Sequence, residues 1–192
     1  MEKVIVYIVN QMEKENIIKQ SEVDEYIYAY ICIFEKIIGV FSIIVLSTIM
    51  HNVFNSLIFL LTFGMLRKRT GGYHFDSFIS CYIFSIIIYI CSCFLSETLY
   101  KHNLILFVFY TIAFITIISL KTINHPNMDL DDEEVLENTL LSHKLIIVIT
   151  CIDLAFYNIY KLKKLAIYSM VGVILCAVLI CISKISKQEV SK

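Results

Sequence analysis

The chain has 192 residues, of which 58% are hydrophobic and 17% are charged, and its formal net charge is -1. Soluble domains contain roughly half apolar and a quarter charged residues, so this composition excludes an ordinary water-soluble fold and indicates a membrane protein. The cationic residues form local clusters instead of one continuous face, which predicts no nucleic-acid partner.

The first 25 residues are expected to form an amphipathic, interfacial segment. Val4, Ile8 and Met12 recur at helical spacing, and Ile5 widens this apolar stripe. The opposite side is polar, as it is in helices that lie on a membrane surface. The same pattern fits an ordinary helix packed on another part of the chain, so the sequence leaves both placements open.

A transmembrane domain is expected over residues 26–183, where six apolar stretches have lengths near the roughly 20 residues that cross a bilayer. The second stretch is short and the fifth contains Asp153, so either one is expected to be re-entrant or tilted. We predict an all-α, polytopic membrane helical bundle with about six transmembrane helices and an N-terminal amphipathic helix. The six stretches are residues 27–50, 52–66, 77–96, 103–123, 145–160 and 163–183.

The distribution of Lys and Arg predicts the orientation of this domain. If the N-terminus is cytoplasmic, most cationic residues lie inside, including residues 67–69 and the tail at 184–192. The acidic connection at 121–144 is then also cytoplasmic, as a solvated loop or short helix. The cations left outside are Lys101, Lys161, Lys163 and Lys164.

A candidate catalytic pair, His74 and Cys81, lies at the start of the third apolar stretch. In an uninterrupted helix the two residues would be about 10.5 Å apart along the axis, too far for proton transfer. Gly71 and Gly72 permit backbone angles that would let the segment with His74 fold back. The sequence therefore predicts a structural hinge at this glycine pair.

A helix that begins after Asp76 or Ser77, either of which can cap it, places Cys81 near its first turn. The positive end of the helix dipole and a neighbouring imidazolium would favour the nucleophilic thiolate there. Free backbone N–H groups at the same helix end can hold an oxyanion. A histidine and a cysteine at this spacing also occur by chance, in which case His74 is an interfacial residue and the glycines form an ordinary turn.

The basic cluster Arg67, Lys68 and Arg69 has two interpretations. It can attract an acidic peptide and set the register of cleavage, which makes it a tentative substrate-binding site. Alternatively, it only anchors the end of a helix on the cytoplasmic side.

These residues resemble a motif of the accessory gene regulator B (AgrB) family, the membrane peptidases of Gram-positive quorum sensing. The similarity includes the Arg67 to Arg69 cluster, then Gly71-Gly72-Tyr73-His74, then Cys81 seven positions later, in a chain of matching length. A proline-containing polar connection, here with Pro126, is a further shared feature. Phe75 departs from the family pattern, in which a small residue is commoner.

The resemblance implies that His74 is the catalytic base and Cys81 the nucleophile of a cysteine endopeptidase without a cofactor. The implied substrate is an AgrD-like propeptide with an amphipathic leader, a short signal segment and a charged tail. Cleavage at the junction of signal and tail would leave an acyl-enzyme, and a Cys or Ser of the peptide would then close a thiolactone or lactone ring. The implied location is the cell membrane, with the active site on the cytoplasmic side.

Other classes of protein remain open. In a non-enzymatic peptide exporter or small permease, the intramembrane residues Glu35 and Asp153 would matter and Cys81 would not. A cysteine acyltransferase acting on another substrate is a third class. The seven cysteines lie mostly in apolar runs without companion histidines, which predicts neither a disulfide framework nor a metal site. The sequence also leaves open whether the protein is a homodimer.

Overall fold

The computed structural model describes residues 2–73, 78–124 and 130–186, and within these ranges the regular elements are all helical. This confirms the predicted all-α class. A 3-10 turn, η1 (Gln20–Glu22), precedes the second of seven α-helices. The helices are α1 (Glu2–Lys14), α2 (Val23–Ile49), α3 (Val53–Thr70), α4 (Phe78–Lys101), α5 (Asn103–Ser119), α6 (Asp132–Tyr157) and α7 (Lys163–Ile185).

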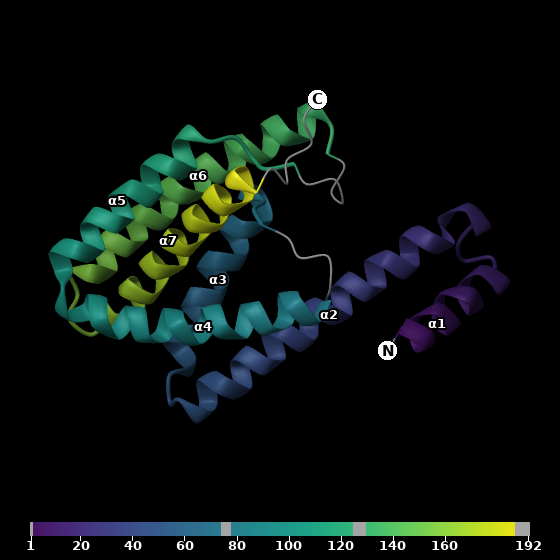
Figure 1. Cartoon of the computed structure of the whole chain (residues 1–192), viewed down its shortest axis with the longest axis horizontal. Helices are drawn as coiled ribbons and strands as arrows, with labels where there is room; N and C mark the ends of the chain where they lie inside the picture. Colours follow the sequence, from purple (N-terminus) through teal and green to yellow (C-terminus); the bar gives the residue numbers. More distant parts are fainter. Residues whose placement is uncertain (1, 74–77, 125–129, 187–192) are drawn as a thin grey trace.

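The bundle is built around α7, which packs against α3, α4, α5 and α6 (Figure 1). Side chains around the whole circumference of α7 are buried, among them Ile167, Met170 and Val173. At Gly172, an added Cβ would lie 3.4 Å from the carbonyl oxygen of Phe59 on α3. That is an ordinary van der Waals distance, so the α3–α7 contact does not require glycine at this position.

An arm made of α1 and the N-terminal half of α2 stands to one side of this bundle (Figure 1). Ile5 and Val9 of α1 are buried with Ile18 of the connection, and residues of α2 pack against them. The structure thus places α1 on another part of the chain, which was one of the two expected placements. Val4 and Ile8, from the predicted apolar stripe, remain exposed.

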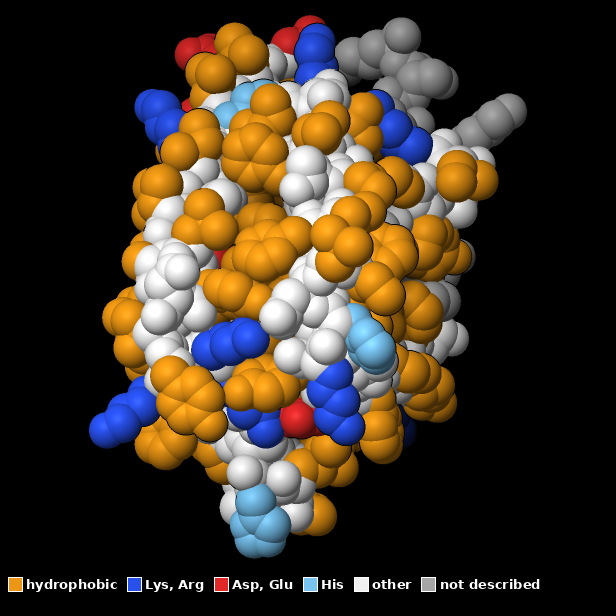
Figure 2. Space-filling model, turned by 90° about the vertical axis from the view of Figure 1, so that its left-hand side faces the viewer, with side chains coloured by type: hydrophobic (Ala, Val, Ile, Leu, Met, Phe, Trp, Pro, Cys, Tyr) orange, Lys and Arg blue, Asp and Glu red, His pale blue; other side chains and the backbone are white. Residues whose placement is uncertain are grey.

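Four helical segments are long and apolar enough to cross a membrane, namely Gln20–Ile49, Ile79–Lys101, Asp132–Tyr157 and Lys163–Ile185. The chain is therefore a multi-pass membrane protein by length and composition. The apolar α5 is shorter, and α3 is not among the four segments. Figure 2 shows hydrophobic side chains over the middle of one face of the bundle, with charged side chains gathered toward its two ends.

One end of the bundle, here called the motif end, holds the basic turn of α3, the connection after α5 and the beginning of α6. Contacts join these segments: Arg69 Nη1 donates to Asn138 Oδ1 over 2.8 Å, and Thr122 Oγ1 donates to the carbonyl oxygen of Arg69 over 2.8 Å. The first turn of α6 lies at this end, whereas α7 begins at the opposite end (Figure 1).

The helix α6 differs from the sequence-based boundaries. It begins at Asp132, inside the acidic segment expected to be a loop or a short helix, and continues without a break to Tyr157. The reason is a capping box: Asp131 accepts a hydrogen bond from the Glu134 N–H, and the Glu134 side chain accepts one from the Asp131 N–H. Thr139 and Ser142 then turn inward and are buried.

Candidate active site

The glycine pair directly follows α3 and turns the chain sharply. Gly71 has a φ of 67° and Gly72 a φ of 135°, values that side-chain-bearing residues rarely adopt. The hydrogen bond of the Gly71 N–H to the carbonyl oxygen of Arg67, 3.1 Å long, closes the last turn of the helix. Both glycines thus adopt backbone angles that favour glycine, and the predicted folding back of the segment with His74 stays a prediction.

Close packing is a second reason for glycine at both positions. A Cβ on Gly71 would lie 2.4 Å from the carbonyl oxygen of Ile123, and a Cβ on Gly72 would lie 1.7 Å from Nη1 of Arg67. Gly71 is thus packed against the backbone of the connection after α5, and Gly72 is packed against the guanidinium group of Arg67. The sequence indicated the conformational reason and not the packing reason.

Arg67 is committed to contacts within the motif. Its guanidinium donates hydrogen bonds to the carbonyl oxygens of Gly71 and Tyr73, so it holds the chain that leaves α3. Burial lowers the pKa of Arg67, and attraction to the thiolate forms of Cys176 and Cys81 opposes that shift.

The other two cations of the cluster have different surroundings. Arg69 is half-buried and donates to the side chain of Asn138 on α6, as described above. Lys68 is exposed. The cluster therefore does not present three equivalent charges to a partner.

Cys81 is an exposed, free thiol in the first turn of α4, where the sequence predicted it. Its carbonyl oxygen accepts a hydrogen bond from Ser85 Oγ over 2.8 Å, a contact within the helix. His74 and the capping candidates Asp76 and Ser77 lie outside the described residues. The separation of His74 from Cys81 stays a prediction.

The connection after α5 is a part of the site that the sequence did not reveal. The Thr122 hydroxyl and the Ile123 N–H donate to the carbonyl oxygens of Arg69 and Thr70 at the end of α3. Nothing in the local pattern around Thr122 signals a partner about fifty residues earlier. A cap supplied from another element leaves no sequence signature of the kind that a capping box does.

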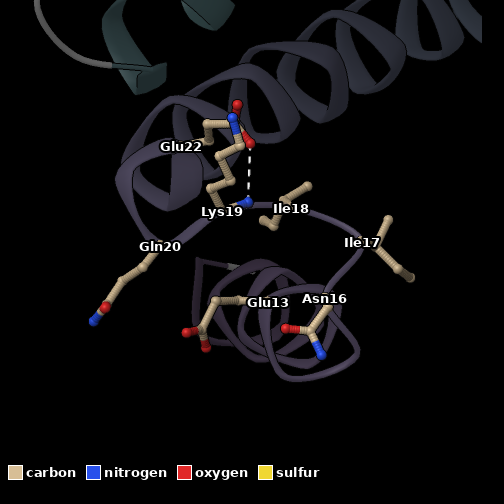
Figure 3. Close-up of a pocket in the computed structure, with 7 residues that line it drawn as sticks. All are labelled: Glu13, Asn16, Ile17, Ile18, Lys19, Gln20 and Glu22. Carbon is tan, nitrogen blue, oxygen red and sulfur yellow. Dashed lines mark hydrogen bonds between the residues drawn. The ribbon is translucent and has the colours of Figure 1, made fainter.

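Two cavities are lined by residues outside the 67–81 motif, although the second reaches Tyr82, the residue after Cys81. One, of about 510 Å³, lies at the elbow between α1 and α2 and includes Lys19, whose backbone N–H donates to Glu22 Oε2 over 2.9 Å (Figure 3). The other is an apolar groove of about 490 Å³ between α2 and α4, bridged by a 2.9 Å hydrogen bond from Tyr82 to Ser42. Neither is lined by a histidine or a cysteine.

Asp153, one of the two intramembrane acidic residues noted in the sequence, is 2% exposed in α6. Its Oδ2 accepts a hydrogen bond of 3.1 Å from the Tyr110 hydroxyl, which is also 3.0 Å from Thr150 Oγ1. No cation pairs with this carboxyl group among the described residues. The described ranges also contain no cluster of three or more His, Cys, Asp or Glu residues suited to a metal.

Comparison with known proteins gives one family. The family model described as "AgrB: Accessory gene regulator B" matches residues 2–187 of this chain. A protein of Clostridium perfringens (strain 13 / Type A), described as "Putative AgrB-like protein 2", is 34% identical over 88 residues, which is 45% of this chain and 41% of that protein. The chain thus aligns with less than half the length of this relative. No solved structure matches the chain.

Proposed function

Because this chain belongs to the accessory gene regulator B family, we propose that it is a membrane cysteine endopeptidase that removes the C-terminal tail from an AgrD-like quorum-sensing propeptide. The observation that carries the proposal is the placement of Cys81. It is an exposed thiol in the first turn of α4, shortly after the Gly71–Gly72 turn that Arg67 anchors.

The proposed reaction begins with the Cys81 thiolate. Its sulfur attacks the carbonyl carbon at the junction of signal and tail, and the oxyanion is held by N–H groups at the start of α4. His74 takes the thiol proton and gives it to the leaving amine, so the C–N bond breaks and the tail departs. The remaining peptide is joined to Cys81 as a thioester.

Ring closure is the second proposed step. A Cys or Ser side chain within the signal segment attacks the thioester, its proton passes to the Cys81 sulfur, and a thiolactone or lactone is released. Exchange of one thioester for another is nearly balanced energetically, which suits a thiol nucleophile. The surrounding apolar helices support this step because they limit the access of water, which would hydrolyse the intermediate.

We also propose six membrane crossings with the motif end in the cytoplasm. The apolar parts of α3 and α5 would add two crossings to the four long segments. The support is a small excess of cations at the motif end, since cytoplasmic ends carry the excess of Lys and Arg. The cations at the motif end are Arg67, Lys68, Arg69, Lys121 and Lys184, and those at the opposite end are Lys101, Lys161, Lys163 and Lys164.

The direct test expresses the full chain in membranes with an AgrD-like propeptide that carries an internal cysteine and an acidic tail. Cys81→Ala and His74→Ala are each expected to abolish cleavage, because the first removes the nucleophile and the second the proton carrier. Cys91→Ala, which changes another exposed cysteine of α4, is the matched control and is expected to leave cleavage unchanged. Cleavage of the propeptide by Cys81→Ala would refute the proposal.

A peptide exporter is the second candidate, and buried Asp153 is the observation that favours it. A carboxyl group inside a membrane bundle is often part of a transport path. In the same membranes, an exporter would move the intact propeptide across the bilayer without cutting it. Asp153→Asn, which keeps an acceptor for Tyr110, would then stop transport, whereas a peptidase would still cleave.

A further inference from the structure

We propose that Thr122 is a positioning residue of the site. Its hydrogen bond fixes the position of the end of α3. It thereby also fixes the direction in which the chain leaves the Gly71–Gly72 turn toward the catalytic segment. This inference rests on the proposed peptidase function. The segment that contains Thr122, residues 121–124, is called the strap below.

The strap completes the hydrogen bonding at the C-terminus of α3. The last carbonyl groups of a helix have no partners within it and must find them elsewhere. The carbonyl oxygen of Arg69 accepts from Thr122 Oγ1 over 2.8 Å, and that of Thr70 accepts from the Ile123 N–H over 2.9 Å. The next carbonyl oxygen, at Gly71, accepts from Arg67 and from Thr70 Oγ1. Two of these three carbonyl groups therefore depend on the strap.

The contact between the strap and the end of α3 is closely packed and shielded from solvent. Thr122 and Thr70 are each 3% exposed, and Ile123 is fully buried. The carbonyl oxygen of Ile123 fills the space that a side chain on Gly71 would need. Because water does not reach these groups, a lost hydrogen bond from Thr122 is not replaced by solvent. The Arg69 carbonyl would then have to shift to find another donor.

The strap is itself held by α6. The Thr122 N–H donates to Thr139 Oγ1 over 3.0 Å, and the Thr139 hydroxyl lies 3.1 Å from Thr122 Oγ1. The side chain of Asn124 accepts from the Leu130 N–H and donates to the Leu130 carbonyl oxygen, at 3.1 and 2.7 Å, just before α6 begins. Thr122 thus joins the end of α3 to α6, beside the direct hydrogen bond from Arg69 to Asn138.

Thr122 is expected to affect the reaction because of where the residues that it holds lie along the chain. Thr122 fixes the carbonyl group of Arg69, which is two residues before Gly71, and Arg67 in turn holds the carbonyl groups of Gly71 and Tyr73. A displacement at Arg69 is passed to the turn and to the carbonyl groups that the Arg67 guanidinium holds. Small displacements of catalytic groups reduce rates strongly, so the strap is expected to affect the rate of cleavage more than the binding of the propeptide.

The experiment compares Thr122→Val with Thr122→Ser in the full chain, reconstituted in liposomes with the acidic-tailed propeptide. Valine has nearly the same shape as threonine but no hydroxyl group, whereas serine keeps the donor. The matched control is Thr98→Val, because the Thr98 hydroxyl is exposed and bonds only to Phe94 of its own helix. Cleavage rate at saturating propeptide, KM, and alkylation of Cys81 by iodoacetamide as a function of pH are measured for each variant.

Thr122→Val is expected to lower the saturated cleavage rate about tenfold with KM unchanged, and to alter the pH profile of Cys81 alkylation. Thr122→Ser should stay within about twofold of the parent rate, and Thr98→Val should match it. The proposal is overturned if Thr122→Val cleaves at the parent rate, or if Thr122→Ser is as slow as Thr122→Val.

Two further variants ensure that the experiment gives a clear result. If Thr122→Val does not accumulate in membranes, Thr122→Ala is measured instead, because it also removes the donor to the Arg69 carbonyl group and adds no bulk. An unchanged rate in Thr122→Ala would then overturn the proposal. Cys81→Ala separates the two proposals. If Cys81→Ala still cleaves the propeptide, the proposed peptidase function is wrong. If Cys81→Ala is inactive while Thr122→Val cleaves at the parent rate, only the positioning role is wrong.

Discussion

Three neighbouring cations that look alike in the sequence have three different environments. The Arg67 guanidinium is bound to backbone carbonyl groups, Arg69 is bound to Asn138, and Lys68 is exposed. The sequence predicted one basic cluster, either for an acidic substrate tail or for anchoring a helix end. We propose that only Lys68 is available to a propeptide tail, since the other two are engaged within the bundle.

Charge reversal tests this assignment at single residues. If Lys68 contacts the tail, Lys68→Glu is expected to slow cleavage of an acidic-tailed propeptide several-fold and to leave a neutral-tailed one almost unaffected, with the difference shrinking at high salt. Lys144→Glu, another exposed cation, serves as the control for net charge. Equal losses for the two propeptides would mean that Lys68 only anchors the helix.

At the level of elements, the sequence predicts best what is encoded locally. Apolar stretches placed the cores of α2 to α7, and the position of Cys81 in the first turn of α4 followed from where that stretch begins. The start of α6 was not placed because hydropathy alone left its polar first turns as a loop or a short helix, although Asp131 and Glu134 carry a capping signal. The strap was missed because it acts between elements far apart in the chain.

The end of α3 offers a matched pair of glycine substitutions. Gly71→Ala is expected to destabilise the protein by about 2 kcal/mol or more, because it adds a Cβ at positive φ and against the Ile123 carbonyl group. Gly64→Ala, in the middle of the same helix with nothing within 4 Å, is expected to be neutral or to stabilise by about 0.5 kcal/mol. Thermal unfolding in detergent micelles compares the two, and equal midpoints would contradict the tight turn described here.

On the scale of the whole molecule, charged side chains gather at the two ends of the bundle. The motif end brings together the end of α3, the strap and the start of α6, and the opposite end holds the turn before α7. Hydrophobic side chains cover the face between them (Figure 2). Composition was enough to predict a membrane protein, whereas the number of crossings depends on α3 and α5, which are not among the four segments that are long and apolar enough for a span.

The proposed orientation makes a prediction for the intact membrane. A membrane-impermeant maleimide should label exposed Cys81 in inside-out vesicles and not in right-side-out vesicles, because the motif end faces the cytoplasm. A cysteine introduced by Lys161→Cys, at the exposed turn before α7, should give the opposite pattern. Labelling of Cys81 from the outside would invert the proposed topology.

The most direct test of the central claim is to detect the thioester on Cys81. A propeptide whose internal nucleophile is replaced by alanine cannot close a ring, so the acyl-enzyme should accumulate. Mass spectrometry of the chain is then expected to show Cys81 carrying the leader and signal segment without the tail, in a bond that neutral hydroxylamine releases. If the tail is removed while Cys81 never carries the peptide, covalent catalysis by this thiol is contradicted.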